Sequence, residues 1–171
     1  MRRDAAIEPP PSGGRVSVRA LTAPTRTEIE ELAAIFDEYR AHYGEAPDAA
    51  RSATWLERNL QSSRFTAFVA ADEGRPLGFA IALEVPASLR LGHFWQTRDL
   101  FVVPHRRHLG VGRALLGSVR AAAIAAGALR LVVQTENDND PALRLYAESG
   151  YTWVEGYRSL TLPLSPESAA S

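Results

Sequence analysis

The chain of 171 residues contains neither cysteine nor lysine, and each absence excludes a class of chemistry. Without cysteine there is no disulfide, no thiolate metal site and no cysteine nucleophile. Because all 19 basic residues are arginine, a Schiff-base lysine and the lysine of a phosphate-binding P-loop are also excluded. No apolar run is long enough to span a bilayer, and no signal peptide is visible at the start. We therefore expect a cytoplasmic protein with no membrane partner and no metal site.

The chain also lacks an excess of either charge, since its formal net charge is -1. Bulk electrostatics therefore do not favour binding to nucleic acid, and any anion site must be local. Hydrophobic residues make up 46% of the chain and charged residues 23%, which is ordinary for a globular protein. We expect one domain over residues 15–164, between a disordered segment (1–14) and a flexible tail (165–171) that are rich in small and polar residues.

Between these ends the apolar periodicity switches several times between that of a strand and that of a helix. Strands are predicted over residues 15–21, 64–85 (two strands joined by a turn at 72–75), 92–103, 129–135 and 151–164, the last being one or two strands. Helical periodicity predicts helices within residues 25–44, 48–63, 111–126 and 140–150. The order β-α-α-β-β-β-α-β-α-β-β indicates an α/β fold, with one sheet and helices on its faces.

One junction between a strand and a helix carries a pattern suited to anions. Arg107, Gly110 and Gly112 form the spacing R-x-x-G-x-G at this point. The first N–H groups of a helix lack intrahelical partners, glycine lets a phosphate approach the backbone, and the arginine fork fits phosphate oxygens. A pyrophosphate is the natural ligand of such a turn. On this motif alone, a flexible turn flanked by solvated arginines is an equally good interpretation.

A second pattern lies downstream, from Asn139 to Tyr151, where the sequence fits N-x-x-A-x-x-L-Y-x-x-x-G-F/Y throughout. The two patterns, in this order, resemble those of the GNAT acetyltransferase superfamily, and the resemblance covers residues 15–164, most strongly from Arg98 to Tyr151. It implies a GNAT acyl-CoA N-acyltransferase fold, with a mixed central sheet of about six to seven strands flanked by about four helices. It also implies acetyl-CoA as co-substrate.

By this resemblance, one stretch of strand and one turn hold coenzyme A. In the family, the strand before the first motif pairs with the pantetheine arm, and the following turn binds the pyrophosphate. Asn139 would orient the cofactor or cap the last helix. Asp140, followed by Pro141 at the first helical position, is the better cap candidate, which leaves Asn139 freer for the ligand. The implied contacts to coenzyme A are Leu100, Phe101, Val102, Arg107, His108, Leu109, Gly110, Val111, Gly112, Arg113, Asn139 and Tyr146.

The resemblance also names Tyr146 as the acid that protonates the leaving thiolate. A phenol with a pKa near ~10 is protonated at neutral pH, although the spacing of Tyr146 from Leu143 is also that of a core aromatic. Polyamine acetyltransferases of the family carry a Glu-Asp pair before the binding strand, and here the pair is Arg98-Asp99. Asp99 is therefore the candidate base, acting through a water, or else a structural carboxylate paired with an arginine. Further candidates for the base are Glu84, Glu136 and His93.

The acceptor site is expected around the first helix–helix connection, where acidic and aromatic residues suit a cationic amine or simply form a solvated helix end: Asp37, Glu38, Tyr39, His42, Tyr43, Glu45 and Asp48. The leading function is N-acetylation of a primary amine of a small molecule. Alternatives are N-acetylation of a protein or peptide, and a non-catalytic acyl-CoA sensor on the same fold. A homodimer is compatible with the sequence, whereas three arginines at one helix start are too few to predict binding to nucleic acid.

Overall fold

The computed structural model describes residues 16–156, 158–162 and 164, so the expectations for segments 1–14 and 165–171 lie outside the described residues. In chain order the elements are β1 (Ser17–Leu21), α1 (Arg26–His42), α2 (Ala49–Gln61), β2 (Thr66–Asp72), β3 (Arg75–Ala87), β4 (Gly92–Val102), α3 (Val111–Ala125), β5 (Leu131–Val133) and α4 (Asp140–Glu148). Short 3₁₀ turns, η1 (Ser88–Arg90) and η2 (Pro104–Arg106), flank β4. The predicted order of elements is confirmed as far as α4. No helix in the described part of the chain has the length and apolar character needed to cross a membrane.

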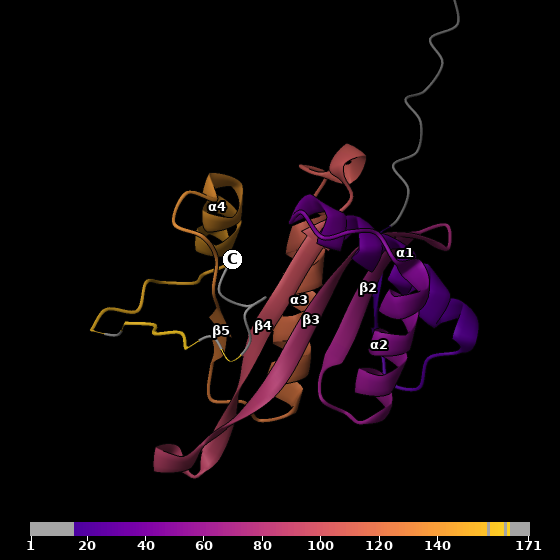
Figure 1. The fold of residues 1–171 in the computed structure, drawn as a ribbon. Helices are drawn as coiled ribbons and strands as arrows, with labels where there is room; N and C mark the ends of the chain where they lie inside the picture. The colour runs from indigo at the N-terminus through magenta and orange to yellow at the C-terminus, as the bar shows by residue number, and fades with distance from the viewer. Residues whose placement is uncertain (1–15, 157, 163, 165–171) are drawn as a thin grey trace, which may run out of the picture.

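The described strands form one mixed sheet in the order β1-β2-β3-β4-β5 (Figure 1). The pairs from β1 to β4 are antiparallel, and β5 joins β4 in parallel. β2 and β3 are joined by a tight turn in which Glu73 and Gly74 both have positive φ (48° and 80°), as two-residue hairpin turns require. The chain passes from β4 to β5 through α3, because parallel strands need a long connection. The α/β class is therefore confirmed.

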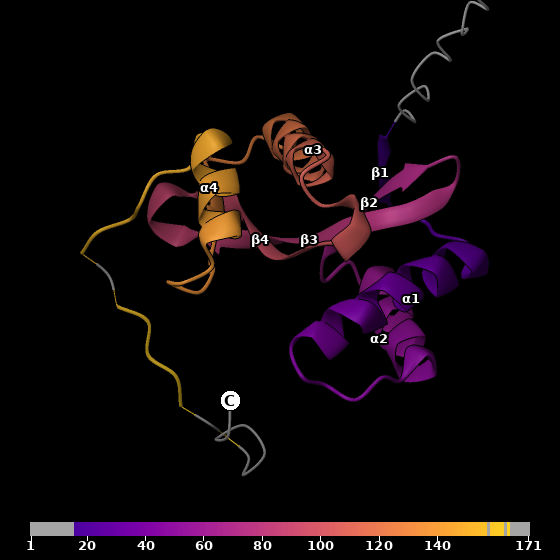
Figure 2. The ribbon, with the colours of Figure 1, turned by 90° about the horizontal axis from the view of Figure 1, so that it is seen from above.

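The sheet separates two apolar cores. Figure 2 shows α1 and α2 on one side of the sheet and α3 on the other. On the first side, Leu32, Phe36 and Leu56 belong to one core with Phe79 of β3. On the second side, small side chains of the sheet meet one stripe of α3: Ala70, Ala80, Ala82, Val111, Leu115, Val119 and Ala123. Because successive residues of a strand face opposite sides, the register of β4 decides which helices its side chains reach.

The stretch after α4 differs from the expectation. Residues 151–164 were expected to add one or two strands, yet the described positions 151–156, 158–162 and 164 contain none. Gly156 has a φ of 84°, which interrupts an extended backbone, and β5, with 3 residues, offers only a short edge for pairing. The described sheet therefore has five strands, close to the expected number of about six to seven. The large apolar side chains of this stretch are exposed: Trp153, Val154, Leu160, Leu162 and Leu164.

Candidate active site

A β-bulge in β4 decides which way the polar residues of this strand face. The register of β3 against β4 shifts after Ile81, which leaves Arg98 as an extra residue in β4. Before the bulge, Trp95 belongs to the core on the α3 side, whereas Phe101, beyond it, belongs to the core on the α1 side. The bulge therefore reverses the alternation of β4 and turns the side chain of Asp99 toward α1.

Beyond the bulge, one edge of β4 is open. β5 pairs with β4 over residues 95–97 and ends there. The N–H of Val103 donates to β3 (3.0 Å), so the alternation of the ladder directs the backbone groups of Leu100 and Val102 to the opposite, open edge. The side chain of Arg107 agrees with this direction, because its Nε donates to the carbonyl of Val102 (3.0 Å). The open edge can therefore pair with an extended ligand.

The turn between β4 and α3 contains two residues in the left-handed conformation. These are His108 (φ 63°) and Gly110 (φ 82°), and Gly110 is the N-cap of α3. A Cβ on Gly110 would meet nothing within 4 Å, so backbone conformation rather than crowding favours glycine here. Because Gly110 makes no side-chain cap, the first N–H groups of α3 are left for a ligand.

Gly112 serves the packing of two helices. A Cβ at this position would lie 3.0 Å from Cδ2 of Leu145, so α4 lies close against the first turn of α3. An ion pair between Arg113 of α3 and Glu148 of α4 (2.5 Å) is a second contact between the same two helices. This packing brings Tyr146, the residue after Leu145, to the end of the sheet where β4 meets the turn.

The three residues from Arg106 to His108 have different surroundings. Arg106 reaches Asp72 in the β2–β3 turn (3.6 Å), while His108 is exposed. Arg107 lies on the open edge of β4, with its guanidinium carbon 5.7 Å from the ring centroid of Phe101. Arg107 is therefore the basic side chain of this turn that lies beside the open strand edge.

Asp99 lies half-buried on the α1 side of the sheet, where its Oδ1 accepts a hydrogen bond from the hydroxyl of Tyr39 (2.7 Å). Burial raises the pKa of Asp99, and the bond from Tyr39 and the nearby charge of Arg98 act in the opposite direction with smaller effect. Its hydrogen-bond partner is thus a tyrosine rather than the arginine that the sequence suggested. A carboxylate with a raised pKa is a better proton acceptor near neutral pH than an ordinary one.

Tyr146 combines a buried ring with a protonated hydroxyl. The residue is 9% exposed, and its ring centroid lies 5.7 Å from that of Tyr151. Burial raises the pKa of Tyr146 to about 12, so the phenol stays protonated at neutral pH. Tyr146 is therefore a buried aromatic residue, and its hydroxyl is protonated at neutral pH; its role as proton donor stays a prediction.

Two further side chains connect Asp99 with Tyr146. Tyr43, the C-cap residue of α1, has its pKa raised by burial and then by the charges of Glu136 and Asp99. Tyr43 and Glu136 in turn raise the pKa of Tyr146. Hydrogen bonds join α1 to β4 (Tyr39 to Asp99) and α4 to the loop after β5 (Asn139 to Glu136). The charge effects indicate that these two pairs of elements lie near each other. The pKa of Glu136 is lowered by its own backbone N–H and by the amide of Asn139, so this carboxylate is ionised at neutral pH.

The N-cap of α4 is Asn139, and the prediction that Asp140 caps this helix was wrong. The Oδ1 of Asn139 accepts from the N–H of Ala142 (3.2 Å), and its Nδ2 donates to Glu136 (3.4 Å). Asn and Asp cap helices about equally well, so the sequence could not separate two adjacent candidates. Asn139 is engaged in capping, and a contact to coenzyme A would have to replace one of these two bonds.

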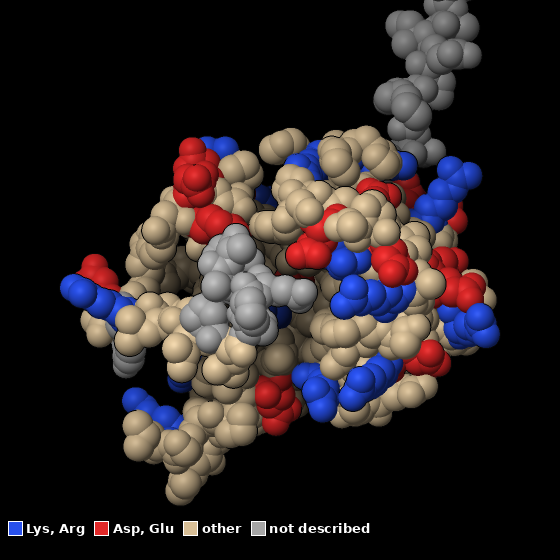
Figure 3. All heavy atoms as spheres, viewed as in Figure 1, with Lys and Arg blue, Asp and Glu red and all other residues tan. Residues whose placement is uncertain are grey.

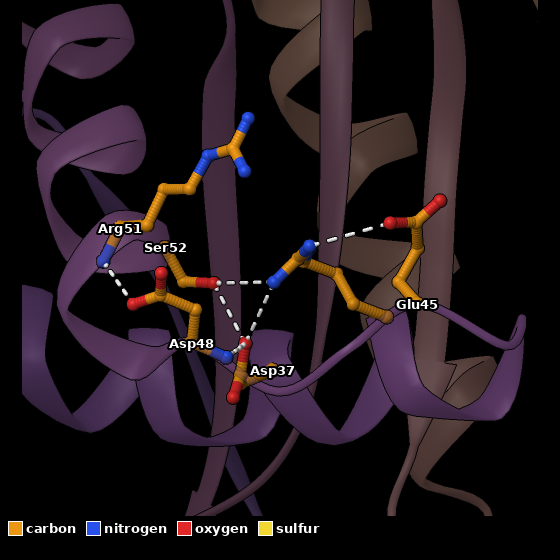
Figure 4. A network of polar contacts seen from close by, with 6 residues as sticks. Asp37, Glu45, Asp48, Arg51 and Ser52 are labelled. Carbon is orange, nitrogen blue, oxygen red and sulfur yellow. Dashed lines mark hydrogen bonds and ion pairs between the residues drawn. The ribbon is translucent and has the colours of Figure 1, made fainter. Parts of the chain in front are cut away.

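Three acidic residues at the α1–α2 connection, Asp37, Glu45 and Asp48, have partners within the two helices (Figure 4). Asp37 is buried and accepts from the side chain of Arg40 (3.0 Å), the backbone N–H of Asp48 (3.1 Å) and the hydroxyl of Ser52 (2.9 Å). Asp48 is the N-cap of α2, and Glu45 pairs with Arg40 (3.5 Å). The pKa of Asp37 is lowered, first by the bond from the backbone of Asp48. Asp37 therefore links α1 to α2, whereas Asp48 caps α2 and Glu45 pairs with an arginine of α1.

The other candidates for the base separate into two groups. Glu84 and His93 lie 3.9 Å apart toward the η1 end of the β3–β4 hairpin. Glu84 is in register with Trp95, which places it on the α3 side of the sheet, opposite to Asp99. Glu136 is at the site, beside Tyr43 and Tyr146, as described above. Of the four carboxylate and histidine side chains that the sequence offered as the base, Asp99 and Glu136 therefore lie at the candidate site.

Charges on the face seen in Figure 3 are mixed. Arginine and acidic side chains are interspersed over α1 and α2, and neither sign forms a continuous area there. No field of a single sign therefore extends across this face. A ligand that binds on this side would be attracted by individual groups such as Asp99 and Arg107.

Three features of the site could not be identified from the sequence: the bulge at Arg98, the hydrogen bond from Tyr39 to Asp99, and the close approach of β3 and β4 at Gly78. A Cβ on Gly78 would lie 2.5 Å from the carbonyl oxygen of Phe101, so glycine permits the close approach of β3 and β4. This carbonyl is on the β3 side of the strand. Phe101 therefore does not present its backbone to the open edge, unlike its two neighbours in the sequence.

Comparison with known proteins agrees with this geometry. The model of the acetyltransferase (GNAT) family matches residues 29–151, a range that includes the open edge of β4, the glycine turn and α4. A protein of Bacillus subtilis (strain 168), described as the uncharacterized N-acetyltransferase YhfO, is 32% identical over 131 residues, which are 77% of this chain and 88% of that protein.

Two solved structures extend the comparison to three dimensions. The crystal structure of a probable acetyltransferase is 27% identical, with a TM-score of 0.78 over 88% of this chain and 98% of that chain. The aminoglycoside N-acetyltransferase AAC(6')-Iy in complex with CoA, 20% identical, has the same fold, with a TM-score of 0.71 over 89% of this chain and 97% of that chain. The chain therefore belongs to the GNAT acetyltransferase family.

Proposed function

We propose that the protein transfers the acetyl group of acetyl-CoA to a primary amine of a small molecule by direct attack of the amine on the thioester. The observation that carries the proposal is the open edge of β4, which runs from the bulge beside Asp99 toward the turn at Gly110. A ligand paired along this edge would have one end at the N-terminus of α3 and the other beside Asp99. Phosphates suit the first end and a reacting acyl group suits the second.

The residues along the edge fit coenzyme A. The backbone groups of Leu100 and Val102 would pair with the amides of the pantetheine arm. The N–H groups of the first turn of α3 and the guanidinium of Arg107 would hold the pyrophosphate. Arg107 would exchange its present bond to the Val102 carbonyl (3.0 Å) for the phosphate oxygens.

Acetyl-CoA supplies an activated carbonyl and a thiolate leaving group, and the chain moves the protons. An alkylammonium titrates near ~10, so it must lose a proton before it attacks. Asp99 accepts this proton, directly or through a water. While the C–N bond forms and the C–S bond breaks, Tyr146 donates its phenolic proton to the departing sulfur. The amine nitrogen then loses its second proton, which returns to the Tyr146 phenolate, so that the amide and the free thiol form while one proton stays on Asp99. The N–H of Leu100, on the open edge, is the donor available to the carbonyl oxygen.

Aromatic side chains beside Asp99 support a small cationic acceptor. His42 and Tyr43 at the end of α1 lie edge to face (5.3 Å between centroids), and the ring of His42 lies 6.4 Å from that of Phe101. Aromatic faces next to a carboxylate favour an ammonium group. The aminoglycoside N-acetyltransferase compared above acts, by its name, on small molecules that carry amines, which supports the same class here.

Release of free thiol from acetyl-CoA, measured across a panel of amines, amino acids and peptides, tests the proposed function. We expect release with small primary amines and formation of the matching acetamide by mass spectrometry. Binding of acetyl-CoA by calorimetry without release on any acceptor would indicate a sensor. Faster release with peptides than with small amines would favour a protein acceptor.

Gly110→Asp and Gly110→Asn form a matched pair that tests the phosphate site. Both residues tolerate the left-handed conformation of Gly110 (φ 82°), and both can cap the helix. We expect the aspartate variant to bind acetyl-CoA about 10- to 100-fold more weakly than the asparagine variant, because only its carboxylate repels the phosphates. Calorimetry measures the two affinities. Equal affinities would show that the turn serves folding alone.

Tyr146→Phe tests the proton donor. The ring that packs on Tyr151 is kept, while the hydroxyl whose pKa is about 12 is removed. We expect kcat to fall by about 10²-fold, which is the low end of the range for loss of a general acid. The effect is small because a thiol with a pKa near ~8.5 can also leave as the unprotonated thiolate. The affinity for acetyl-CoA, measured by calorimetry, should stay the same. An unchanged kcat would remove Tyr146 from the mechanism.

A further inference from the structure

We propose that Tyr39 of α1 is a positioning residue for Asp99: its hydroxyl holds one oxygen of the carboxylate, so that the other oxygen is presented to the acceptor amine. The inference rests on the proposed function, in which Asp99 is the base. It makes the last turn of α1 part of the catalytic arrangement as well as a wall of the acceptor site.

The contact between the two residues is short and directional. The hydroxyl of Tyr39 lies 2.7 Å from Oδ1 of Asp99, a distance typical of a bond to an ionised carboxylate. Burial, and then the neighbouring carboxylate, raise the pKa of Tyr39 well above its ordinary value, so the phenol stays protonated and donates to Asp99. With Oδ1 occupied in this way, Oδ2 is the oxygen left to accept a proton.

The ring of Tyr39 is held by aromatic neighbours on several sides. Its centroid lies 5.8 Å from that of Phe36, 5.6 Å from that of Phe79, 5.8 Å from that of Phe101 and 5.1 Å from that of Tyr43. Phe36 and Tyr39 are three residues apart, so the tyrosine continues the stripe with which α1 packs on the sheet. A hydroxyl on a ring fixed in this way can hold Asp99 in one orientation.

The end of α1 that carries Tyr39 is itself anchored. Arg40, the next residue, donates to the buried carboxylate of Asp37 (3.0 Å), which also accepts from Ser52 of α2 (2.9 Å) (Figure 4). Helix ends fray when their last turn has no such partners. The network between α1 and α2 therefore keeps Tyr39 in place over the bulge of β4.

The groups around Asp99 determine how its pKa would change if the hydroxyl of Tyr39 were removed. From α1, Tyr39 and Tyr43 face Asp99; from β4, Arg98 lies beside it; and from β3, its register partner is the apolar Ile81. Burial raises the pKa of Asp99, while Tyr39 and Arg98 lower it. Removing the hydroxyl leaves burial opposed by Arg98 alone. The pKa of Asp99 should therefore rise further, and the carboxylate should be lost at a higher pH.

Tyr39→Phe, compared with Tyr43→Phe on the same helix turn, tests the inference through the pH dependence of kcat/KM for amine acetylation. For Tyr39→Phe we expect a loss of about tenfold or more at neutral pH, as for a hydrogen bond to a charged group, and an acid limb moved to higher pH. Tyr43→Phe should leave the acid limb where it is in the wild type. An acid limb that stays in place in Tyr39→Phe would overturn the inference.

Two further measurements separate this inference from the proposed function. The carboxyl ¹³C signal of Asp99, assigned by its absence in Asp99→Asn, can be titrated by NMR without any substrate. A midpoint that rises in Tyr39→Phe supports the inference even if no amine is acetylated, and an unchanged midpoint contradicts it. In the Asp99→Asn background, Tyr39→Phe should cause no further loss of kcat/KM, whereas a residue that only stabilises the fold would lower activity again.

Discussion

Asp99→Asn is expected to lower kcat/KM for amine acetylation by about 10²–10⁴-fold, the range for loss of a positioned general base. Asparagine keeps the shape of the side chain, and its oxygen can still accept from Tyr39, so the fold should persist. Because the amide cannot accept the proton of the ammonium, only acceptor that is already a free amine can react. That fraction grows about tenfold per pH unit below an amine pKa near ~10, so the residual rate should climb with pH.

The wild type should show a different pH profile. Burial raises the pKa of Asp99, so the acid limb should lie at higher pH than for an ordinary carboxylate and should disappear in Asp99→Asn. Glu84→Gln is the matched control, because Glu84 is also a strand carboxylate but lies on the α3 side of the sheet. Its kcat/KM should equal that of the wild type. If Asp99→Asn kept full activity with an unchanged acid limb, Glu136 would be the next candidate for the base.

Elements that depend on neighbouring residues could be predicted from the sequence. A helix was predicted to start near residue 25, and in the structure the hydroxyl of Thr25 accepts from the N–H of Glu28 (3.3 Å) while the Glu28 side chain accepts from the N–H of Thr25 (2.7 Å). The turn at Glu73 and Gly74 was marked by its composition. The R-x-x-G-x-G spacing likewise indicated a turn between a strand and a helix that needs a flexible residue, and Gly110 has a positive φ there. In each case a few adjacent residues decide the local backbone conformation.

The arrangement within the site could not be predicted, because it depends on contacts between distant segments. The extra residue at Arg98 results from the pairing of β3 with β4. The sequence of β4 alone shows no break in the alternation of its apolar and polar residues. The bond from Tyr39 to Asp99 joins residues 60 positions apart. The sequence placed both residues near an amine site, but only the fold shows that one of them holds the other.

The acidic residues after α1 illustrate the limit for charged side chains. Asp37, Glu45 and Asp48 were considered as acceptor contacts because acid near aromatics suits a cation. In the structure, Asp37 is buried and satisfied by Arg40 and Ser52, an arrangement that needs α2 to fold back on α1. Whether a carboxylate faces solvent, a ligand or an internal network is decided by tertiary packing, which composition does not contain.

Gly78→Ala is expected to weaken both the fold and the binding of coenzyme A, although Gly78 touches neither catalytic residue. The added Cβ would lie 2.5 Å from the Phe101 carbonyl oxygen and 3.1 Å from Cα of Val102. Both are backbone atoms, so β4 must move away from β3. We expect the free energy of unfolding to fall by about 1–3 kcal/mol, as for an overpacked core, measured by urea denaturation.

The displaced segment of β4 is the one whose open edge would pair with the pantetheine arm, so binding should suffer along with stability. A misplacement of about 1 Å can cost about 10²-fold in rate, and we expect a loss of kcat/KM of this size under conditions where the variant is fully folded. Gly117→Ala is the control, because a Cβ there meets nothing within 4 Å and alanine favours the helix by about 0.5–1 kcal/mol. That variant should be more stable than the wild type and equally active. A Gly78→Ala variant as stable and as active as the wild type would show that β4 can shift without loss of function. In that case a rigid open edge would not explain the proposed binding of coenzyme A.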